Sequence, residues 1–394
     1  MLIFLRIVFC LKVLIVLTVC LCSCKRIPEE EHVSYPIFHI DTESDKDILF
    51  SELFESIEYI PLETTNKNLV GTVRKVIISN GCYFLLDKHS INAFDKSGAS
   101  MFTINQFGRG VGEYAFVSSF NVDTINKNIE VFDAASMKFI CYDLFTGQFK
   151  KEFKCPYRID SFRKTTNGSY ICLNSSTFSS GPNDYLYILD TARNLQNSLI
   201  PIPPHLYKVA ADAPNNVFIS EDYILFQPAF CDTVYSVTNT DYKPYYVFDF
   251  GSNSIDKKIV GKYESVAGFA RKPYFATIPF GFLASKDFFY TSVIYVNEAF
   301  HVYYSNLSKT LIYGNQVTND IDRGLSWRPE AFDGNESIHL IEPSNFLSHF
   351  EKIRNQLSEE EWTVFLDENE EIGKLINTSN ENDNPIIMRC KLSF

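Results

Sequence analysis

A short glycine-rich segment contains the residues of this sequence that best suit contact with a ligand. Its glycines stand at alternate positions, where they allow positive φ angles and close approach of the backbone. The glycine spacing is not that of a dinucleotide-binding fingerprint, and no βαβ unit follows. The segment is Gly108-Arg109-Gly110-Val111-Gly112-Glu113-Tyr114. We therefore treat it as a candidate ligand-binding loop. Turn chemistry alone also explains the glycines, and it favours a plain connection in which Arg109 and Glu113 pair with neighbours.

The sequence nominates no catalytic residue. It contains no GxSxG nucleophile elbow and no HExxH metal-binding helix. Its seven histidines are scattered, without HxH or HxxxH spacing. Asp87, Asp133 and Asp190 each end a strand-like run, and we interpret them as turn-forming residues rather than ligands. We expect no cofactor; the alternative is a divalent metal held by side chains from distant parts of the chain.

The N-terminus has the features of a secretory signal. Residues 1–23 carry Arg6 and Lys12 but no acidic residue, and the apolar run Val13–Leu21 is shorter than the roughly 20 residues that span a bilayer. The run ends in Leu21-Cys22-Ser23-Cys24, which resembles a bacterial lipobox. We expect residues 1–23 to be a signal peptide and Cys24 to become the lipidated N-terminus. A short membrane helix is the alternative.

Residues 24–36 read as a polar tether between the lipid and a folded domain. Lys25 and Arg26 are followed by Glu29, Glu30 and Glu31. An acidic cluster soon after the lipidated cysteine resembles the surface-export signal of Bacteroidetes lipoproteins. The predicted location is therefore the outer membrane, reached through the lipid, with either leaflet possible.

Composition indicates one large, acidic β domain. The 394 residues carry a formal net charge of −12, and the charge becomes more negative when Arg6 and Lys12 leave with the signal. Such a surface repels phosphate backbones, which disfavours nucleic-acid binding. Aromatic residues make up 15% of the chain, with 35 Phe and 22 Tyr against 17 Gly. Phe and Tyr favour strands, so this composition suits a β core.

Six cysteines remain after the signal and the lipidation site. None forms a CxxC pair or a Cys/His cluster with zinc spacing. Most of them lie in apolar, strand-like runs, where a free cysteine behaves as a small buried hydrophobic residue. An exported domain could form disulfides, but the spacing singles out no pair. They are Cys82, Cys141, Cys155, Cys172, Cys231 and Cys390.

A repeated hairpin pattern predicts the fold. From Val70 to about Ile341, short apolar runs alternate with turns such as Asn80-Gly81, a strong hairpin signal. The six turn markers stand roughly 41 to 64 residues apart, close to the 40–50 residues of a four-stranded propeller blade. We predict an all-β, six-bladed β-propeller over residues 37–394, with a β-sandwich as the alternative. The markers are Gly81, Lys127, Gly168, Asp222, Lys286 and Gly334.

One segment near the C-terminus has helical rather than strand periodicity. Ser344 is placed to cap a first helix, and Ser358 with Glu361 forms a capping-box signature. We predict two or three short helices between about 344 and 375, inserted in the last blade. Ile386–Leu392 then reads as a final strand. This strand or Ile57–Pro61 would complete the last blade and close the ring, which removes the open sheet edge.

Several segments resemble the six-bladed β-propeller lipoproteins of Bacteroidetes, which are related in fold to NHL-repeat propellers. The resemblance spans the chain from about residue 37 to its end, and its most specific segment has Val111 where the family usually has Pro. It implies the propeller and the lipid anchor, but it implies little about activity, because a fold does not fix a function. The segments are Phe54–Thr64, Phe107–Tyr114, Cys231–Tyr235, Phe248–Gly251 and Asn384–Ile387.

Together these observations favour a non-enzymatic, lipid-anchored propeller that binds a ligand or protein at the cell envelope. A glycan or a partner lipoprotein is the expected class of ligand. The alternative is a propeller hydrolase or lyase, metal-assisted or not, with its site at the mouth of the central channel. A purely structural role in an envelope complex is a third hypothesis.

Overall fold

The computed structural model describes residues 35–394 apart from 166, 175–181, 207–216, 220–223, 229–230, 256–274, 279–280 and 327. The predicted signal peptide, Cys24 and most of the predicted tether lie outside these residues, as does the turn marker Asp222. Ile37 to Phe394 form one compact unit. Within the described part of the chain, no helix combines the length and the apolar character that crossing a bilayer requires.

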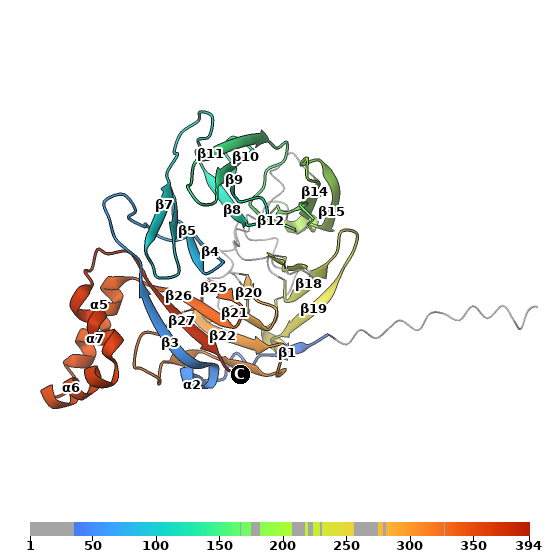
Figure 1. Ribbon diagram of the computed structural model, residues 1–394. Helices are drawn as coiled ribbons and strands as arrows, with labels where there is room; N and C mark the ends of the chain where they lie inside the picture. Colours follow the sequence, from blue (N-terminus) through green and yellow to red (C-terminus); the bar gives the residue numbers. More distant parts are fainter. Residues whose placement is uncertain are drawn as a thin grey trace, which may run out of the picture. The chain divides into compact units, whose positions relative to one another are not determined.

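The compact unit is a six-bladed β-propeller, as predicted (Figure 1). Each blade contains four antiparallel strands, and in blades 1 and 2 short turns join the consecutive strands. At the first of these turns Asn80 and Gly81 have φ angles of 52° and 73°, the positive values that a tight hairpin requires. Blade 1 comprises β4 (Lys75–Ser79), β5 (Cys82–Leu86), β6 (Ile91–Phe94) and β7 (Ser100–Ile104). Blade 2 comprises β8 (Val117–Asp123), β9 (Asn128–Asp133), β10 (Lys138–Asp143) and β11 (Phe149–Lys154).

The remaining blades follow the same order along the chain, with the first strand innermost. Blade 3 comprises β12 (Ser161–Lys164), β13 (Tyr170–Leu173), β14 (Asp184–Leu189) and β15 (Leu195–Pro201). Blade 4 comprises β16 (Val217–Ile219), β17 (Ile224–Phe226), β18 (Thr233–Val237) and β19 (Tyr242–Asp249), and blade 5 comprises β20 (Phe282–Ala284), β21 (Phe288–Tyr295), β22 (Glu298–Ser305) and β23 (Leu311–Gly314). Blade 6 comprises β25 (Ala331–Asp333), β26 (Glu336–Ile341), β27 (Ile386–Leu392) and β3 (Phe54–Pro61).

Contacts between inner strands close the six blades into a ring. In order, β4, β8, β12, β16, β20 and β25 each contact the next, and β25 contacts β4. Blade 6 joins the two ends of the chain, since β3 pairs antiparallel with β27 from Pro61 opposite Ile386 to Phe54 opposite Leu392. Both segments expected at the closure are therefore used, one beside the other, and the last blade has no missing strand.

The N-terminal segment of the unit adds three short elements to the outer edges of the blades. The strand β1 (Ile37–His39) pairs in parallel with β19 of blade 4, and β2 (Asp47–Leu49) pairs in parallel with β24 (Gln316–Thr318). The helix α2 (Phe50–Leu53) then leads into β3. Two 3-10 turns, η1 (Pro204–Leu206) and η2 (Gly251–Asn253), complete the elements outside the C-terminal helices.

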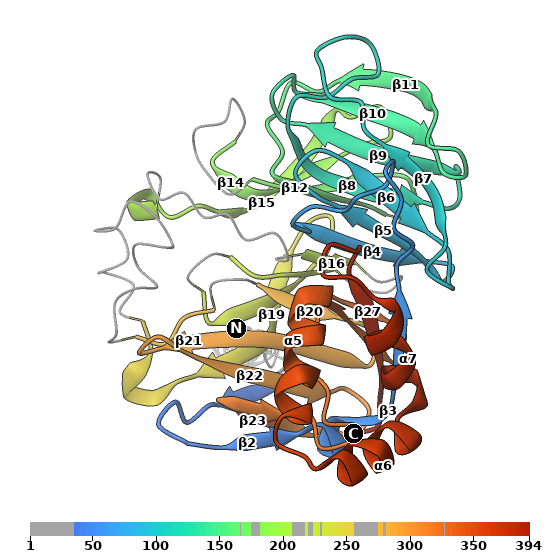
Figure 2. The same ribbon diagram turned by 90° about the vertical axis from the view of Figure 1, so that its left-hand side faces the viewer.

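Three helices lie between β26 and β27 and pack beside blade 6 (Figures 1 and 2). They are α5 (Pro343–Arg354), α6 (Glu359–Glu368) and α7 (Glu370–Thr378). The predicted Ser344 cap is wrong: α5 begins at Pro343 with Glu342 before it, because proline fits the first helical position, where no N–H is needed. The Ser358–Glu361 capping box is confirmed, with Glu361 N donating to Ser358 Oγ at 3.2 Å.

Apolar side chains fill the spaces between blades and behind the helices. Between blades 2 and 3 the cluster includes Phe132, Phe139 and Phe162, and the ring centres of Phe139 and Phe162 lie 5.1 Å apart, edge to face. Trp362 of α6 is 8% exposed and packs in the cluster behind the helices. Cys82, Cys141, Cys155, Cys172 and Cys390 are unpaired thiols. Neighbouring blades are thus held at a fixed separation, which positions the polar groups above each apolar layer.

Substitution of Gly98 tests how tightly β3, the strand that closes the ring, packs against blade 1. The φ of Gly98 is 85°, its carbonyl accepts from Glu63 N at 2.8 Å, and a Cβ there would overlap the carbonyl oxygen of Pro61. Gly98→Ala should therefore lose roughly 3 kcal/mol of unfolding free energy, from the left-handed backbone and the overlap together. Urea denaturation measures this loss.

The matched control is Gly334→Ala. Gly334 also has a positive φ, 60°, but no atom lies within 4 Å of the place that an added methyl group would take. Gly334→Ala should lose only about 1 kcal/mol of unfolding free energy, which is the cost of the left-handed backbone conformation. Equal losses of unfolding free energy in the two variants would show that the turn at Gly98 is not in tight steric contact with the end of β3.

Candidate functional site

The glycine-rich segment connects blade 1 to blade 2. Tyr114 is buried, and its hydroxyl donates to the carbonyls of His89 at 2.7 Å and Ile104 at 2.9 Å. Within the loop, Gly110 N donates to Glu113 Oε2 at 2.8 Å. Glu113 thus folds back on its own loop rather than reaching a neighbouring blade.

Blade 2 holds the other side of this loop. Gly112 N donates to Glu152 Oε2 at 3.0 Å, and the Gly112 carbonyl accepts from the Tyr142 hydroxyl at 2.8 Å. Lys138 donates to the Gly110 carbonyl at 3.0 Å. Arg109 is exposed at the apex. The glycines therefore serve a tightly bonded connection, and a ligand could meet only its outer tip; the ligand-binding role stays a prediction.

The three aspartates interpreted as turn formers are confirmed in that role. Asp87 Oδ1 accepts from the backbone of His89 at 2.7 Å and of Ser90 at 2.6 Å. Asp133 accepts from Phe116 N and Ala135 N, and Asp190 accepts from Asn194 N. Each carboxylate thus accepts at least one backbone N–H of its own turn.

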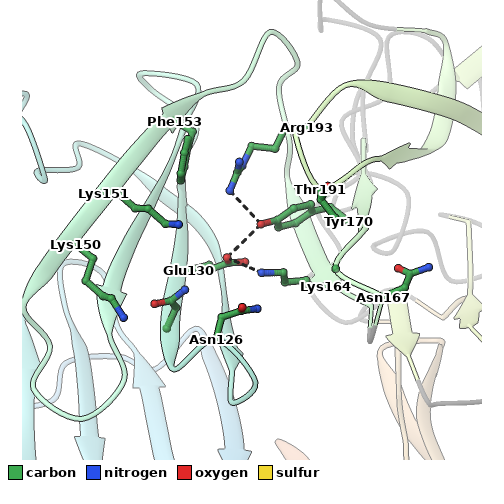
Figure 3. Close-up of a pocket in the computed structure, with 12 residues that line it drawn as sticks. Asn126, Glu130, Lys150, Lys151, Phe153, Lys164, Asn167, Tyr170, Thr191 and Arg193 are labelled. Carbon is green, nitrogen blue, oxygen red and sulfur yellow. Dashed lines mark hydrogen bonds and ion pairs between the residues drawn. The ribbon is translucent and has the colours of Figure 1, made fainter.

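A polar cleft of about 690 Å³ lies between blades 2 and 3 (Figure 3). Its volume is in the range of small-molecule sites. Side chains from β9 and β11 form one wall, and side chains from β12, β13 and the turn after β14 form the other. The lining residues are Asn126, Asn128, Glu130, Lys150, Lys151, Phe153, Lys164, Asn167, Gly168, Tyr170, Thr191 and Arg193.

Strand alternation explains why these residues share one face. Cys141 of β10 stands opposite both Glu130 of β9 and Lys151 of β11, so the three side chains lie on the same side of blade 2. Phe153, two residues after Lys151, shares that side. Glu152 points the other way, toward Gly112. The cleft and the glycine-rich loop therefore lie on opposite faces of β11.

A chain of hydrogen bonds forms the floor of the cleft. Lys164 Nζ lies 2.6 Å from Asp123 Oδ2 and 2.9 Å from Glu130 Oε1. The Tyr170 hydroxyl donates to Glu130 Oε1 at 3.1 Å and accepts from Arg193 Nη2 at 3.2 Å. Burial, followed by the charge of Glu130, raises the pKa of Tyr170 to about 12. The phenol is therefore neutral at pH 7.

Lys164 is charged in spite of its burial. Its side chain is 12% exposed, and those of Asp123 and Glu130 are 6% and 3% exposed. Burial alone would lower the pKa of Lys164, but the hydrogen bond from Lys164 to Asp123 and the charge of Glu130 outweigh it and raise the pKa. For Asp123, burial would raise the pKa, but hydrogen bonds from Lys164 and Asn126 prevail and lower it. The floor is thus an ion network in which two carboxylates share one cation, Lys164.

Arg193 is held over an aromatic ring at one wall. Its guanidinium carbon lies 3.8 Å from the centre of the Phe153 ring, a close cation–π contact. Arg193 has a φ of 71° and belongs to the turn after β14, which carries the side chain across to blade 2. Stacking and the bond to Tyr170 fix the guanidinium in place before any ligand arrives.

The charge balance of the lining favours an anion. Four lining cations stand against one lining carboxylate, Glu130; two of the four are paired, Lys164 with Asp123 and Glu130 and Lys150 with Asp143 at 3.6 Å, which leaves Lys151 and Arg193. A cluster of one sign at a cleft concentrates ions of the opposite sign. The twelve lining residues include no histidine, cysteine or serine. The lining offers cations and amide donors that can bind an anion.

Sequence reasoning missed this cleft almost entirely. Its floor joins Glu130 and Lys164, which come from different blades. One local signal was available: Phe149–Lys154 carries Lys150, Lys151 and Lys154 within six residues of an acidic chain. A basic outer strand of that kind marks one wall of the site.

The scattered histidines do not assemble into a metal site in the described residues. Among these residues, no three His, Cys, Asp or Glu side chains are grouped so that they could hold a metal ion. His301 Nδ1 lies 2.9 Å from the Tyr290 hydroxyl, and burial, with the nearby charge of Arg328, lowers the pKa of His301 to about 4. His339 is buried 2.7 Å from Ser337 Oγ. The metal-assisted alternative stays a prediction without candidate ligands here.

Lys164→Met tests the ion network. The substitution leaves Asp123 and Glu130 buried without their shared cation, which should cost about 3–5 kcal/mol of unfolding free energy at pH 7. Because the folded-state pKa of Asp123 is lowered, its stabilisation is present above the unfolded pKa of about 3.9 and is lost as the pH falls through the lower folded value. The difference in unfolding free energy between the wild type and Lys164→Met should therefore become smaller below about pH 4.

Urea denaturation at pH 7 and at pH 3.5 measures both effects. Lys150→Met is the control, because Lys150 lies at the rim with its side chain 38% exposed, and it should change stability by less than about 0.5 kcal/mol. A Lys164→Met deficit that is the same at both pH values would contradict the assigned network.

Comparisons with known proteins agree with the fold. A solved structure from Bacteroides fragilis, of a protein described as exported, has a TM-score of 0.71 and 17% identity, and the match covers 92% of this chain and 100% of that one. A member of the DUF4221 family from Bacteroides vulgatus has a TM-score of 0.51 and 9% identity, over 87% and 98% of the two chains. These likenesses confirm the expected resemblance to Bacteroidetes propellers. Among curated proteins, none matches the chain.

A family model matches nearly the whole compact unit, over residues 35–391. Its description is "Domain of unknown function (DUF4934)". The segments that carried the sequence resemblance all lie within this match. The chain therefore belongs to the DUF4934 family.

Proposed function

We propose that this chain is a lipid-anchored envelope propeller that binds an acidic carbohydrate in the cleft between blades 2 and 3, without transforming it. The observation that carries the proposal is the cluster of Lys150, Lys151 and Arg193 around the cleft. The exported Bacteroides fragilis protein of the same fold supports export of this chain.

The anionic character of the ligand follows from the charges that are not used internally. Lys164 is already neutralised by Asp123 and Glu130. Lys151 is exposed on the wall, and Arg193 is fixed by stacking on Phe153. A guanidinium in a fixed position suits a carboxylate or sulfate group, which can accept two of its hydrogen bonds.

The carbohydrate character follows from the remaining lining. Asn126, Asn167 and Thr191 place amide and hydroxyl groups around the same opening. Such groups both donate and accept, which suits a ligand covered with hydroxyls. The volume of about 690 Å³ suits a short oligosaccharide. Nucleic acid fits less well, because the whole chain is strongly acidic.

Binding without turnover follows from the groups that the cleft offers. Its one acid, Glu130, is 2% exposed and is bonded to Lys164 and Tyr170. A glycosidase needs two carboxylates flanking the scissile bond. The lining contains a single carboxylate, so it lacks that pair.

Charge reversal at Lys151 tests the ligand site. Lys151→Glu should weaken binding of trigalacturonate to the purified full-length chain at least tenfold, because it places a carboxylate beside the bound carboxylates. Isothermal titration calorimetry at about 0.15 M salt measures it, since the Debye length there is about 8 Å and remote charges are screened.

Lys154→Glu is the matched control, because Lys154 is exposed on the same strand but does not line the cleft. It should change the affinity less than twofold, and neutral maltotriose should not bind the wild type. Absence of trigalacturonate binding, or equal loss in both variants, would refute the proposal. A protein ligand captured through Lys151 instead would point to the protein-binding alternative.

The anchor is tested at Cys24. Cys24→Ala should leave the precursor unlipidated and release the chain from the membrane fraction, because no thiol remains at the lipobox position. Membrane fractionation and intact-mass measurement of the expressed protein check this. Cys22→Ala is the control and should stay lipidated; a Cys24→Ala chain that still carries lipid would show that the lipobox was misassigned.

A further inference from the structure

The inner strands of blades 1 to 3 carry two cations away from the cleft: Lys75 is buried, and Arg163 is half-buried with a buried Nη1. Lys75 is the first residue of β4 and is 8% exposed. Its ammonium donates to Ser119 Oγ at 2.8 Å and to the Phe120 carbonyl at 3.1 Å. Two of its three N–H donors are thereby used, and one is left over.

Arg163 is the second cation. It lies on β12 beside Lys164, but on the opposite side of the strand, because successive strand residues alternate. Its Nη1 is buried and has no hydrogen-bond partner among the described residues. Ser161, two residues earlier, shares its side of β12, and Ser161 Oγ lies 3.4 Å from Ser119 Oγ. A pair of hydroxyls therefore links the surroundings of the two cations.

Neither cation has an acidic partner in the part of the chain that the structure describes. Burial, followed by the positive charge of Arg163, lowers the pKa of Lys75 well below its usual range. Burial lowers the pKa of Arg163 to about 10. Burying unpaired charges is costly. Lys164, by contrast, has two carboxylates beside it.

We propose that Lys75 and Arg163, with the hydroxyls of Ser119 and Ser161, form a binding site for a small oxyanion at the inner strands of blades 1 to 3. The shared chemistry is a compact group of negatively charged oxygens, borne by phosphate, sulfate or a carboxylate. The left-over ammonium donor, the unpartnered guanidinium N–H groups and the hydroxyls supply the hydrogen bonds that such a group accepts. This site is separate from the acidic-carbohydrate cleft and does not depend on it.

Anion-dependent stability of the purified full-length chain tests the site. The protein is dialysed into chloride buffer and titrated with phosphate, sulfate or acetate at matched ionic strength, while thermal unfolding is followed by circular dichroism. At least one of the three should raise the melting temperature saturably, because a ligand bound only to the folded state stabilises it. The three titrations separate an inorganic oxyanion from a carboxylate. No rise above chloride with any of them overturns the proposal.

Four variants locate the effect. Lys75→Met and Arg163→Met should each weaken the anion at least tenfold, as measured by calorimetry with the anion that stabilises the wild type. Lys154→Glu, on the exposed part of β11 outside the cleft, is the control and should leave that affinity unchanged, whereas Lys151→Glu detects an anion held in the cleft. Retention of the affinity in both Lys75→Met and Arg163→Met would mean an adventitious ion only. If Lys151→Glu alone lost affinity for the anion, the anion would be bound in the cleft.

The variants also carry an internal check on folding. In chloride buffer, Lys75→Met should melt no lower than the wild type, since replacing an unpaired buried charge by an apolar side chain is often neutral or stabilising. A large drop in its melting temperature without added anion would show that the ammonium is satisfied by the protein itself, and would overturn the site. The wild-type titration decides the question even if a variant does not fold.

Discussion

The pairing of β3 with β27 is the constraint on which the rest of the propeller depends. It joins residues 54–61 to residues 386–392, so the two ends of the domain lie in one sheet. Without this pairing, blade 6 would lack its outer strand, and the contact of Gly98 with the end of β3 would be lost. The inner strands would then keep no fixed ring, and the distances between neighbouring blades, on which every polar site in this molecule relies, would be free to vary.

Blade packing also explains why one cation at the inner strands has carboxylate partners and two others, within the described ranges of the chain, do not. Between blades 2 and 3, Lys164 is bonded to both Asp123 and Glu130, so its charge is matched within the fold while Lys151 and Arg193 face the opening. Nearer the ring of inner strands, Lys75 and Arg163 have hydroxyls and carbonyls around them but no carboxylate among the described residues. The first arrangement is satisfied by the protein's own carboxylates, whereas the second leaves donors for the proposed oxyanion.

The sequence predicts what is local and misses what depends on the assembled ring. Asn80-Gly81 marks a hairpin because both residues take positive φ angles, and Ser358 marks a helix start because its side chain bonds the backbone. Ser344 misled because Pro343 competes for the same helix start and needs no cap. The strand β1 has no local signal, since three residues pair with a partner about two hundred positions away. The cleft was missed for the same reason: its ion network exists only once blades 2 and 3 are side by side.

The position of the helices has an electrical consequence for the whole domain. Between Glu359 and Glu371 the helices α6 and α7 carry seven acidic residues and no basic one, and they lie beside blade 6. In the order of the ring, blade 6 is across from blade 3, whose wall of the cleft is basic (Figure 1). These two clusters place opposite charges on opposite sides of the ring, with the positive cluster at the cleft. Near a polyanionic surface, this separation favours orientations in which the cleft faces that surface.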